Sequence, residues 1–160
     1  MGLEQKFKML QMIYAGALTD FVLRMGKEGI LEKVTLEKRE EQMLNGKIRA
    51  AQFGIEKPEG VFLVLSDLFG CADWTVERND EGIKAQATKC MLCAMAKKTG
   101  AQSPCNIFCL DPMEGMMRGL NPDIEFDVRE TLWSGQKCTV NVTKKEPVNI
   151  RNLSNANLYY

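Results

Sequence analysis

The sequence predicts an α+β fold in which N-terminal helices precede two antiparallel β-hairpins that form one sheet, with the intervening helices packed on one face. Apolar residues recur every three or four positions from residue 3 to about residue 25, which is typical of an amphipathic helix. Two later segments alternate apolar and polar residues around short turns, and helical segments separate them. Such an order favours an antiparallel sheet with segregated helices over a parallel α/β sheet.

The 160 residues fit a single domain with a substantial core. We assign that domain to residues 1–146, mainly helical over 1–71 and organised as hairpin, helices and hairpin over 72–146. Residues 147–160 form a polar C-terminal tail. Neither an internal repeat nor a low-complexity segment interrupts this organisation.

Three helical segments are expected in the N-terminal half. The first covers 3–25, and the second covers 30–54, where Asn45-Gly46 is a point at which it could be interrupted. The apolar run 61–69 fits a buried strand or a short helix. We favour a helix that ends near Gly70, because a clear strand follows it.

Two hairpins and two helices are expected in the C-terminal half. The first hairpin pairs 72–78 with 83–89 around the turn 79–82, and a short helix closed by Gly100 follows it. Ser103 and Pro104 suit the N-cap and first position of a second helix, in which Pro112 predicts a bend or a restart. The second hairpin pairs 123–133 with 138–143 around 134–136.

Composition narrows the classes of function. The chain has no histidine, which excludes Ser-His and Cys-His catalysis and histidine metal ligands. The 21 basic and 21 acidic residues balance, so no net field favours nucleic acid or an anionic membrane. No apolar run is long enough to cross a bilayer, and no secretory signal is visible at the N-terminus. We therefore expect a cytoplasmic protein whose thiols stay reduced.

Five of the six cysteines form the most distinctive pattern. Cys90 and Cys93 make a C-x2-C pair, Cys105 and Cys109 share one helical face, and Cys138 lies on the apolar face of the last hairpin. Packing of that helix on that strand would bring the thiols together. Clustered thiols suit zinc or an iron–sulfur cluster, although free cysteines are also common as small buried apolar residues. Core packing is the simpler expectation for Cys71.

Two carboxylates are candidate catalytic groups. Asp111 follows Cys109 by two residues and could act as a general base or a metal ligand, although helix capping or solvation is more common. Glu130 shares the strand parity of Ile124, Phe126 and Val128, which predicts that it points inward. A buried carboxylate needs a partner, so Glu130 is either functional or paired with a cation.

The C-terminal half resembles the L-2-amino-thiazoline-4-carboxylic acid hydrolase family. The resemblance spans residues 72–143 and rests on Thr88-Lys89-Cys90, on F-C-L-D at 108–111, on G-L-N-P at 119–122, and on G-Q-K-C at 135–138. The last motif is also similar to the 4-vinyl reductase type of small-molecule-binding domain, in which cysteines and a carboxylate hold a zinc. The resemblance implies an α+β domain with a cysteine-lined pocket and hydrolytic opening of a thiazoline ring to a carbamoyl-cysteine. Cys90, Cys109 and Cys138 fall on family positions, whereas Cys93 and Cys105 are additions of this chain.

Three functions follow as hypotheses. The first is a cytosolic metalloprotein or hydrolase in which Cys90, Cys109 and Cys138 hold a metal with Cys93 or Cys105 as a fourth ligand, and Asp111 or Glu130 is the base. The second is a metal-free thiol hydrolase, in which one cysteine attacks the amidine carbon of a cyclic substrate. The third is a non-enzymatic sensor or binding domain with a structural metal. A small molecule is the expected partner in each, and the exposed face of the first helix also allows a homo-oligomer.

Overall fold

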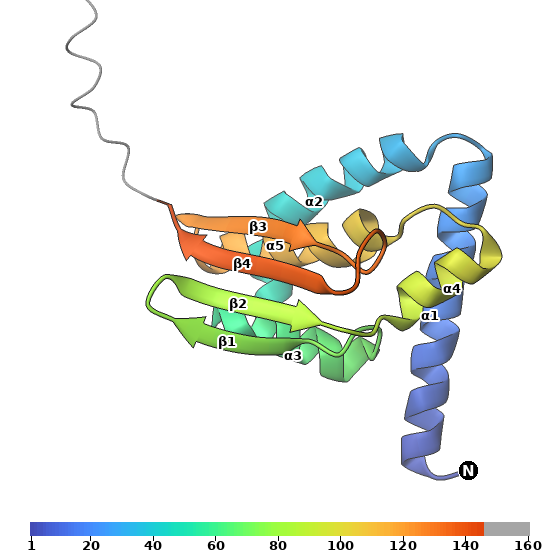
Figure 1. The fold of residues 1–160 in the computed structure, drawn as a ribbon, viewed down its shortest axis with the longest axis horizontal. Coiled ribbons are helices and arrows are strands. Elements are labelled where there is room, and N and C mark those ends of the chain that lie inside the picture. The colour runs from blue at the N-terminus through green and yellow to red at the C-terminus, as the bar shows by residue number, and fades with distance from the viewer. Residues whose placement is uncertain (146–160) are drawn as a thin grey trace, which may run out of the picture.

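The computed structural model describes residues 1–145 and confirms the α+β fold (Figure 1). The predicted tail, 147–160, lies outside the described residues. The N-terminal half forms α1 (Leu3–Lys27), α2 (Leu31–Gln52) and α3 (Pro58–Phe69). The first hairpin is β1 (Thr75–Asn79) with β2 (Gly82–Ala87), and α4 (Met91–Thr99) follows it. A π-helical turn, η1 (Asn106–Leu110), continues into α5 (Asp111–Leu120), and the second hairpin is β3 (Ile124–Glu130) with β4 (Cys138–Lys144).

The two hairpins combine into one open four-stranded sheet. Its strand order is β1-β2-β4-β3, and each neighbouring pair is antiparallel. The central pairing sets Ala87 opposite Cys138 and Ala85 opposite Val140, so the apolar residues of both strands share one face. That face is buried, whereas Lys84 on the intervening position is exposed. The hydrophobic effect on this face holds the hairpins against the helices.

Helices form a second layer on the buried face of the sheet, and further helices pack at one end of the sheet (Figure 1). Helices α3 and α5 contact the sheet, and α2 packs along α5. Helix α1 contacts α4 at the end of the sheet. The N-terminal end of α1 extends beyond the sheet and the other helices. Phe62 and Trp74 pack together in the main core, with ring centroids 5.1 Å apart.

The packing of α2 on α5 depends on glycine. A Cβ at Gly46 would overlap the backbone of Gly115, and a Cβ at Gly119 would overlap the backbone of Lys47. Helix α2 therefore runs without interruption past Asn45-Gly46. The glycine that could have broken this helix instead lets a second helix approach it closely.

Helix boundaries near proline and glycine follow the predicted chemistry. The apolar run 61–69 is helical, with Pro58 at its first position and Gly70 in the left-handed conformation at its end. The hydroxyl of Ser103 accepts a hydrogen bond from the Cys105 N–H at 3.3 Å, as expected for a capping residue. The predicted restart near Pro112 occurs at Asp111, where the π-helical turn ends and α5 begins.

The prediction that Glu130 points inward on strand parity was wrong. A β-bulge between Val128 and Glu130 shifts the register of β3 against β4. Glu130 is only partly buried, and its Oε1 accepts a hydrogen bond from the Gln136 N–H at 2.7 Å. This carboxylate therefore braces the connection between the two strands.

Candidate active site

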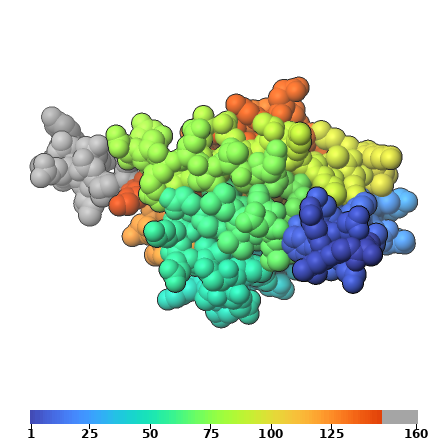
Figure 2. Space-filling view, turned by 90° about the horizontal axis from the view of Figure 1, so that it is seen from below, coloured from blue at the N-terminus to red at the C-terminus, as the bar shows by residue number. Residues whose placement is uncertain are grey.

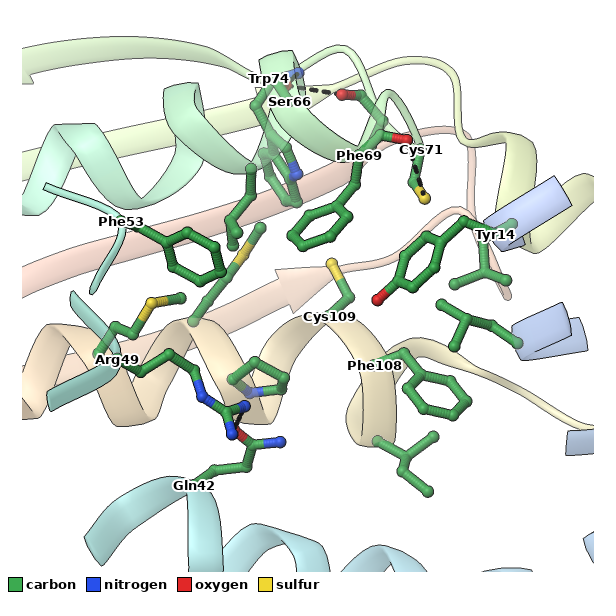
Figure 3. A pocket seen from close by; sticks show the side chains of 18 of the residues that line it. Tyr14, Gln42, Arg49, Phe53, Ser66, Phe69, Cys71, Trp74, Phe108 and Cys109 are labelled. Carbon is green, nitrogen blue, oxygen red and sulfur yellow. Dashed lines mark hydrogen bonds between the residues drawn. The ribbon is translucent and has the colours of Figure 1, made fainter. Parts of the chain in front are cut away.

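A cavity of about 300 Å³ lies between α1, α2, α3 and the η1–α5 segment, and we call it the large cavity (Figure 3). Most of its lining is apolar, including Phe53, Leu65, Phe69, Trp74, Phe108 and Met113. Its lining also includes Tyr14 and Gln52, both exposed to solvent, so it opens to the surface. This volume and lining are typical of a small-molecule site.

Aromatic packing fixes the wall that α1 contributes. The ring of Tyr14 stacks on Phe69 with centroids 5.0 Å apart, and Phe21 meets Phe108 edge-on at 5.5 Å. Gln11 on α1 donates hydrogen bonds to the carbonyls of Asp67 and Leu68 at the end of α3. Helix α1 is thereby anchored to two elements that line the large cavity.

The α2 wall of the large cavity carries a positive charge. The Arg49 guanidinium donates a 2.5 Å hydrogen bond to the side-chain carbonyl of Gln42, and Figure 3 shows the two side chains together. Lys38 also lines this wall. No Asp or Glu among the described residues lines the large cavity. An anionic ligand would therefore find charge compensation there and no opposing carboxylate.

Cys90 occupies a special position among the thiols that reach the large cavity. It is the N-cap of α4, and its Sγ accepts a hydrogen bond from the Cys93 N–H at 3.4 Å. The pKa of Cys90 is lowered to about 7, mainly by a hydrogen bond from the Cys93 thiol. The backbone N–H groups of Cys93 and Leu92 lower it further, and burial acts in the opposite direction. The lowered pKa favours the thiolate of Cys90, which is the nucleophilic form of a cysteine.

The connection from β2 to α4 holds Cys90 in place. The Asp73 carboxylate accepts hydrogen bonds from the Thr88 N–H, the Thr88 hydroxyl and the Lys89 N–H at 2.8–3.2 Å. The backbone of Ala72 bridges that of Cys90 in an isolated antiparallel pair. The Thr88-Lys89-Cys90 motif is thus tied to the segment that precedes β1.

Cys93 and Cys105 lie behind Cys90. Their Sγ atoms are 3.5 Å apart, and both residues are buried. The pKa of Cys93 is raised, first by its hydrogen bond with Cys105 and then by Cys90, so Cys93 keeps its proton. The same contact with Cys93 lowers the pKa of Cys105. One protonated thiol therefore stands beside two acidic ones.

The other cysteines are poorer nucleophiles. Burial raises the pKa of Cys71 to about 11 and that of Cys138 to about 11. Burial also raises the pKa of Cys109 well above its usual range. Cys71 and Cys109 line the large cavity as neutral thiols, so Cys90 differs in reactivity from its neighbours there.

All five cysteines of the predicted cluster border a second, small cavity of about 20 Å³. These five residues therefore line one small cavity. They do not converge on one point, however, because the described residues contain no group of three or more Cys, Asp or Glu placed to hold a metal ion. Cys138 instead accepts a hydrogen bond from the Leu132 N–H at 3.3 Å. A zinc or iron–sulfur site is therefore not shown among the residues that the structure describes.

Asp111 lies away from the lining of the large cavity and belongs to an ion-pair cluster. Arg39 on α2 contacts Asp111 at 2.5 Å and Glu114 at 2.7 Å, and Arg118 also pairs with Glu114. Burial raises the pKa of Asp111, and Arg39 opposes that rise. The cluster joins α2 to α5, so the visible role of Asp111 is to stabilise that packing.

Sequence reasoning missed Arg49, Gln42, Tyr14 and Asp73 as site residues. Gln42 and Arg49 are seven residues apart, which places them on one face of a helix, so a signal for that pair was present. No local pattern distinguished Tyr14 from other apolar residues of its helix, or Asp73 from an ordinary surface carboxylate. Their roles depend on contacts with segments distant in the chain.

The family described as L-2-amino-thiazoline-4-carboxylic acid hydrolase matches residues 8–141. The chain belongs to this family. The match extends the likeness from the C-terminal half to most of the chain, including the helices that line the large cavity. The relationship to the 4-vinyl reductase type of domain is not shown. No curated protein and no solved structure matches the chain.

Membership supports a hydrolase-like relationship and a small-molecule substrate. Among the described residues, no helix is both long enough and apolar enough to span a membrane.

Proposed function

We propose that this member of the thiazoline-carboxylate hydrolase family hydrolyses a small cyclic amidine in the large cavity, with Cys90 as the nucleophile. The observation that carries the proposal is the position of Cys90, which combines access to the large cavity with the N-cap of α4 and a pKa of about 7. The chain has no histidine that could activate a thiol as a general base. A cysteine that is already a thiolate does not need one.

The reaction balances in two steps. The Cys90 thiolate attacks the amidine carbon, a bond from Cys90 sulfur to that carbon forms, and the ring C–S bond breaks. The ring sulfur leaves as a thiolate and takes up a proton. Water then adds to the same carbon, the Cys90 thiolate leaves, and the product is a carbamoyl-cysteine. Covalent catalysis of this kind replaces one difficult displacement by two easier ones.

The substrate class follows from the charges of the large cavity. Arg49 and Lys38 line it without any described carboxylate, and the guanidinium of Arg49 is held in place by Gln42. A guanidinium is well suited to a carboxylate. We infer that the substrate carries a carboxylate that lies against the α2 wall.

The test is turnover of 2-amino-thiazoline-4-carboxylic acid, followed by mass spectrometry of the product. Cys90→Ser is expected to lower kcat/KM by at least about hundredfold. The native rate should rise with pH through about 7, because the thiolate is the reactive form. Cys138→Ser is the matched control, since Cys138 is outside the lining of the large cavity. Loss of activity in both variants would favour a metal site over a single nucleophile.

Binding of this compound without turnover would contradict the hydrolase proposal and favour the non-enzymatic binding function. A zinc ion or iron–sulfur cluster on Cys90, Cys93, Cys105, Cys109 and Cys138 stays a prediction of the sequence. Metal analysis of protein purified without oxygen tests that prediction. Six free cysteines suit a reducing compartment, so we infer a cytoplasmic location.

A further inference from the structure

Two further cysteines, Cys93 and Cys105, lie near the proposed nucleophile and border the small cavity with it. Cys90 lines both cavities, whereas Cys93 and Cys105 line only the small one. Cys93 contacts Cys105 through sulfur at 3.5 Å, and its N–H reaches the Cys90 sulfur at 3.4 Å. Cys93 therefore contacts both the Cys90 sulfur at the large cavity, through its N–H, and the Cys105 sulfur in the core, through its thiol.

A C-x2-C pair whose first cysteine caps a helix is suited to thiol–disulfide chemistry. The helix N-terminus stabilises the first sulfur as a thiolate, and two intervening residues place the second within reach of it. Cys93 is protonated and buried, as a resolving thiol needs to be until the first sulfur has been oxidised.

We propose that Cys90 and Cys93 form a reversible disulfide switch, in which a peroxide oxidises Cys90 through the large cavity and Cys93 resolves the product. In the first step the Cys90 thiolate attacks a peroxide oxygen, the O–O bond breaks, and Cys90 becomes a sulfenic acid as hydroxide leaves. The Cys93 sulfur then attacks the Cys90 sulfur, the S–O bond breaks, and water leaves. Two thiols are oxidised and the peroxide is reduced.

Cys105 gives the switch a third sulfur. Its thiolate can attack the Cys93 sulfur of the first disulfide, which forms a Cys93–Cys105 bond and releases Cys90 as a thiolate. The 3.5 Å contact between Cys93 and Cys105 makes this exchange geometrically direct. Formation of the disulfide does not depend on the proposed function. Only its effect on activity rests on the proposed function, because a Cys90 held in a disulfide cannot attack a substrate.

Treatment of the full chain with hydrogen peroxide, followed by peptide mapping without reduction, tests the switch. The expected product is a Cys90–Cys93 disulfide, with a Cys93–Cys105 disulfide at longer times. Labelling of Cys90 by iodoacetamide should be lost while the Cys90–Cys93 disulfide persists and should be fully recovered after dithiothreitol. It should also return without reductant once the Cys93–Cys105 disulfide has formed. In Cys93→Ala, recovery should be at least about tenfold lower, because unresolved Cys90 proceeds to sulfinic acid. Cys138→Ala is the control and should recover like the native chain.

Disulfide mapping and thiol labelling do not depend on turnover. Peroxide that oxidises Cys90 to sulfinic acid with neither a Cys90–Cys93 nor a Cys93–Cys105 disulfide formed in the native chain would overturn the switch, even if hydrolysis is confirmed. A mapped Cys90–Cys93 disulfide would support it, even if no thiazoline is hydrolysed. Mapping uses the native chain, so the result does not depend on whether the Cys93 variant folds.

A separate observation concerns the N-terminal end of α1, which projects beyond the rest of the molecule (Figure 1). In the space-filling view its dark blue surface lies at one end of the molecule (Figure 2). Large apolar side chains are exposed along it, including Leu3 at 84%, Leu10 at 63% and Ile13 at 60%. An isolated helix of this length is only marginally stable in water, and such a surface is typical of an interface.

The outward face of α1 is complementary to itself in antiparallel register. With Ile13 set opposite Ile13 of a second copy, Leu10 faces Gly16, Met9 faces Ala17, and Lys6 faces Asp20. A Cβ at Gly16 would meet no atom within 4 Å, so this glycine leaves a notch on the surface. We infer that two copies pair through α1, with large side chains against small ones and Lys6 of each copy beside the Asp20–Arg24 ion pair of the other.

Sedimentation equilibrium tests this pairing. The native chain is expected to be a dimer, and Ile13→Glu should weaken association at least about tenfold because it sets two carboxylates together at the centre. Leu44→Glu is the control, since Leu44 is an exposed apolar residue on α2. A monomeric native chain would overturn the pairing, and binding of that monomer to vesicles of anionic phospholipid would assign the face to a membrane surface.

Discussion

At the scale of single residues, local backbone geometry separates six cysteines into different chemical classes. Cys90 has a pKa of about 7 because it receives hydrogen bonds from the Cys93 thiol and from the start of α4, whereas Cys71 has a pKa of about 11 because burial is not compensated. Both line the large cavity. Reactivity there depends on the donors that reach each sulfur and not on proximity to the cavity alone.

The Arg39 cluster gives a prediction at the same scale. Arg39→Met leaves Asp111 and Glu114 without their shared cation in a buried setting. Because the Arg39 side chain is 39% exposed, solvent softens the loss, and we expect the free energy of unfolding to fall by about 2–3 kcal/mol at pH 7. The deficit should shrink at low pH, because burial raises the pKa of Asp111 and its carboxyl takes up a proton there. Urea denaturation at both pH values measures it.

Arg78→Met is the matched control for Arg39→Met. Arg78 pairs with Glu59 at an exposed position, and a surface ion pair contributes on the order of 0.5 kcal/mol. Equal losses of stability in the two variants would show that the buried carboxylates are compensated in another way.

At the scale of elements, the crossing of α2 and α5 positions both walls of the large cavity. Gly46, Gly115 and Gly119 allow the two backbones to touch, and Arg49 follows Gly46 by less than one turn of α2. Separation of these helices would therefore move the Arg49–Gln42 pair relative to Cys109 on the facing element. Backbone contact and site geometry are coupled through this crossing.

Gly46→Ala tests that coupling. The added Cβ overlaps the Gly115 carbonyl, so the helices must separate, and we expect a loss of about 2–3 kcal/mol in the free energy of unfolding. Asn45→Ala, one residue earlier and exposed, should change stability by about 0.5 kcal/mol or less. Thermal unfolding of both variants decides the question, and equal melting temperatures would mean that the crossing can relax without cost.

The elements were largely predictable because their signals are local. Pro58 and Gly70 bracket α3, the turn 79–82 joins β1 to β2, and Gly100 closes α4. The β-bulge before Glu130 was not predictable, since it depends on how β3 meets β4 and not on residue type. The pairing of Arg39 with Asp111 joins residues 72 positions apart and has no local signal.

The candidate site was predictable in part for the same reason. Helix and strand periodicity assigned Cys105, Cys109 and Cys138 to apolar faces that should meet, and the three residues line one small cavity with Cys90 and Cys93. It could not set their mutual distances, and a metal site is decided by distances of a few tenths of an ångström. The polar wall of Arg49 and Gln42 had the spacing of one helical face, but its importance depends on the apolar elements opposite it.

At the scale of the whole molecule, the neutral thiols make stability depend on alkaline pH. Folding raises the pKa values of Cys71 and Cys138 from about 9 to about 11 through burial. The unfolded chain therefore loses these protons first, and their contribution to stability is complete below pH 9 and is lost as pH rises toward 11. Burial also raises the pKa of Tyr14, which acts in the same direction.

Urea midpoints of the reduced protein should fall steadily between pH 9 and 11. The double variant Cys71→Ala/Cys138→Ala should show a shallower decline over that interval, since Tyr14 still titrates. Parallel curves for the two proteins would mean that folding does not raise the pKa of either thiol, so the surroundings of Cys71 and Cys138 would have to be far more polar than the residues around them indicate.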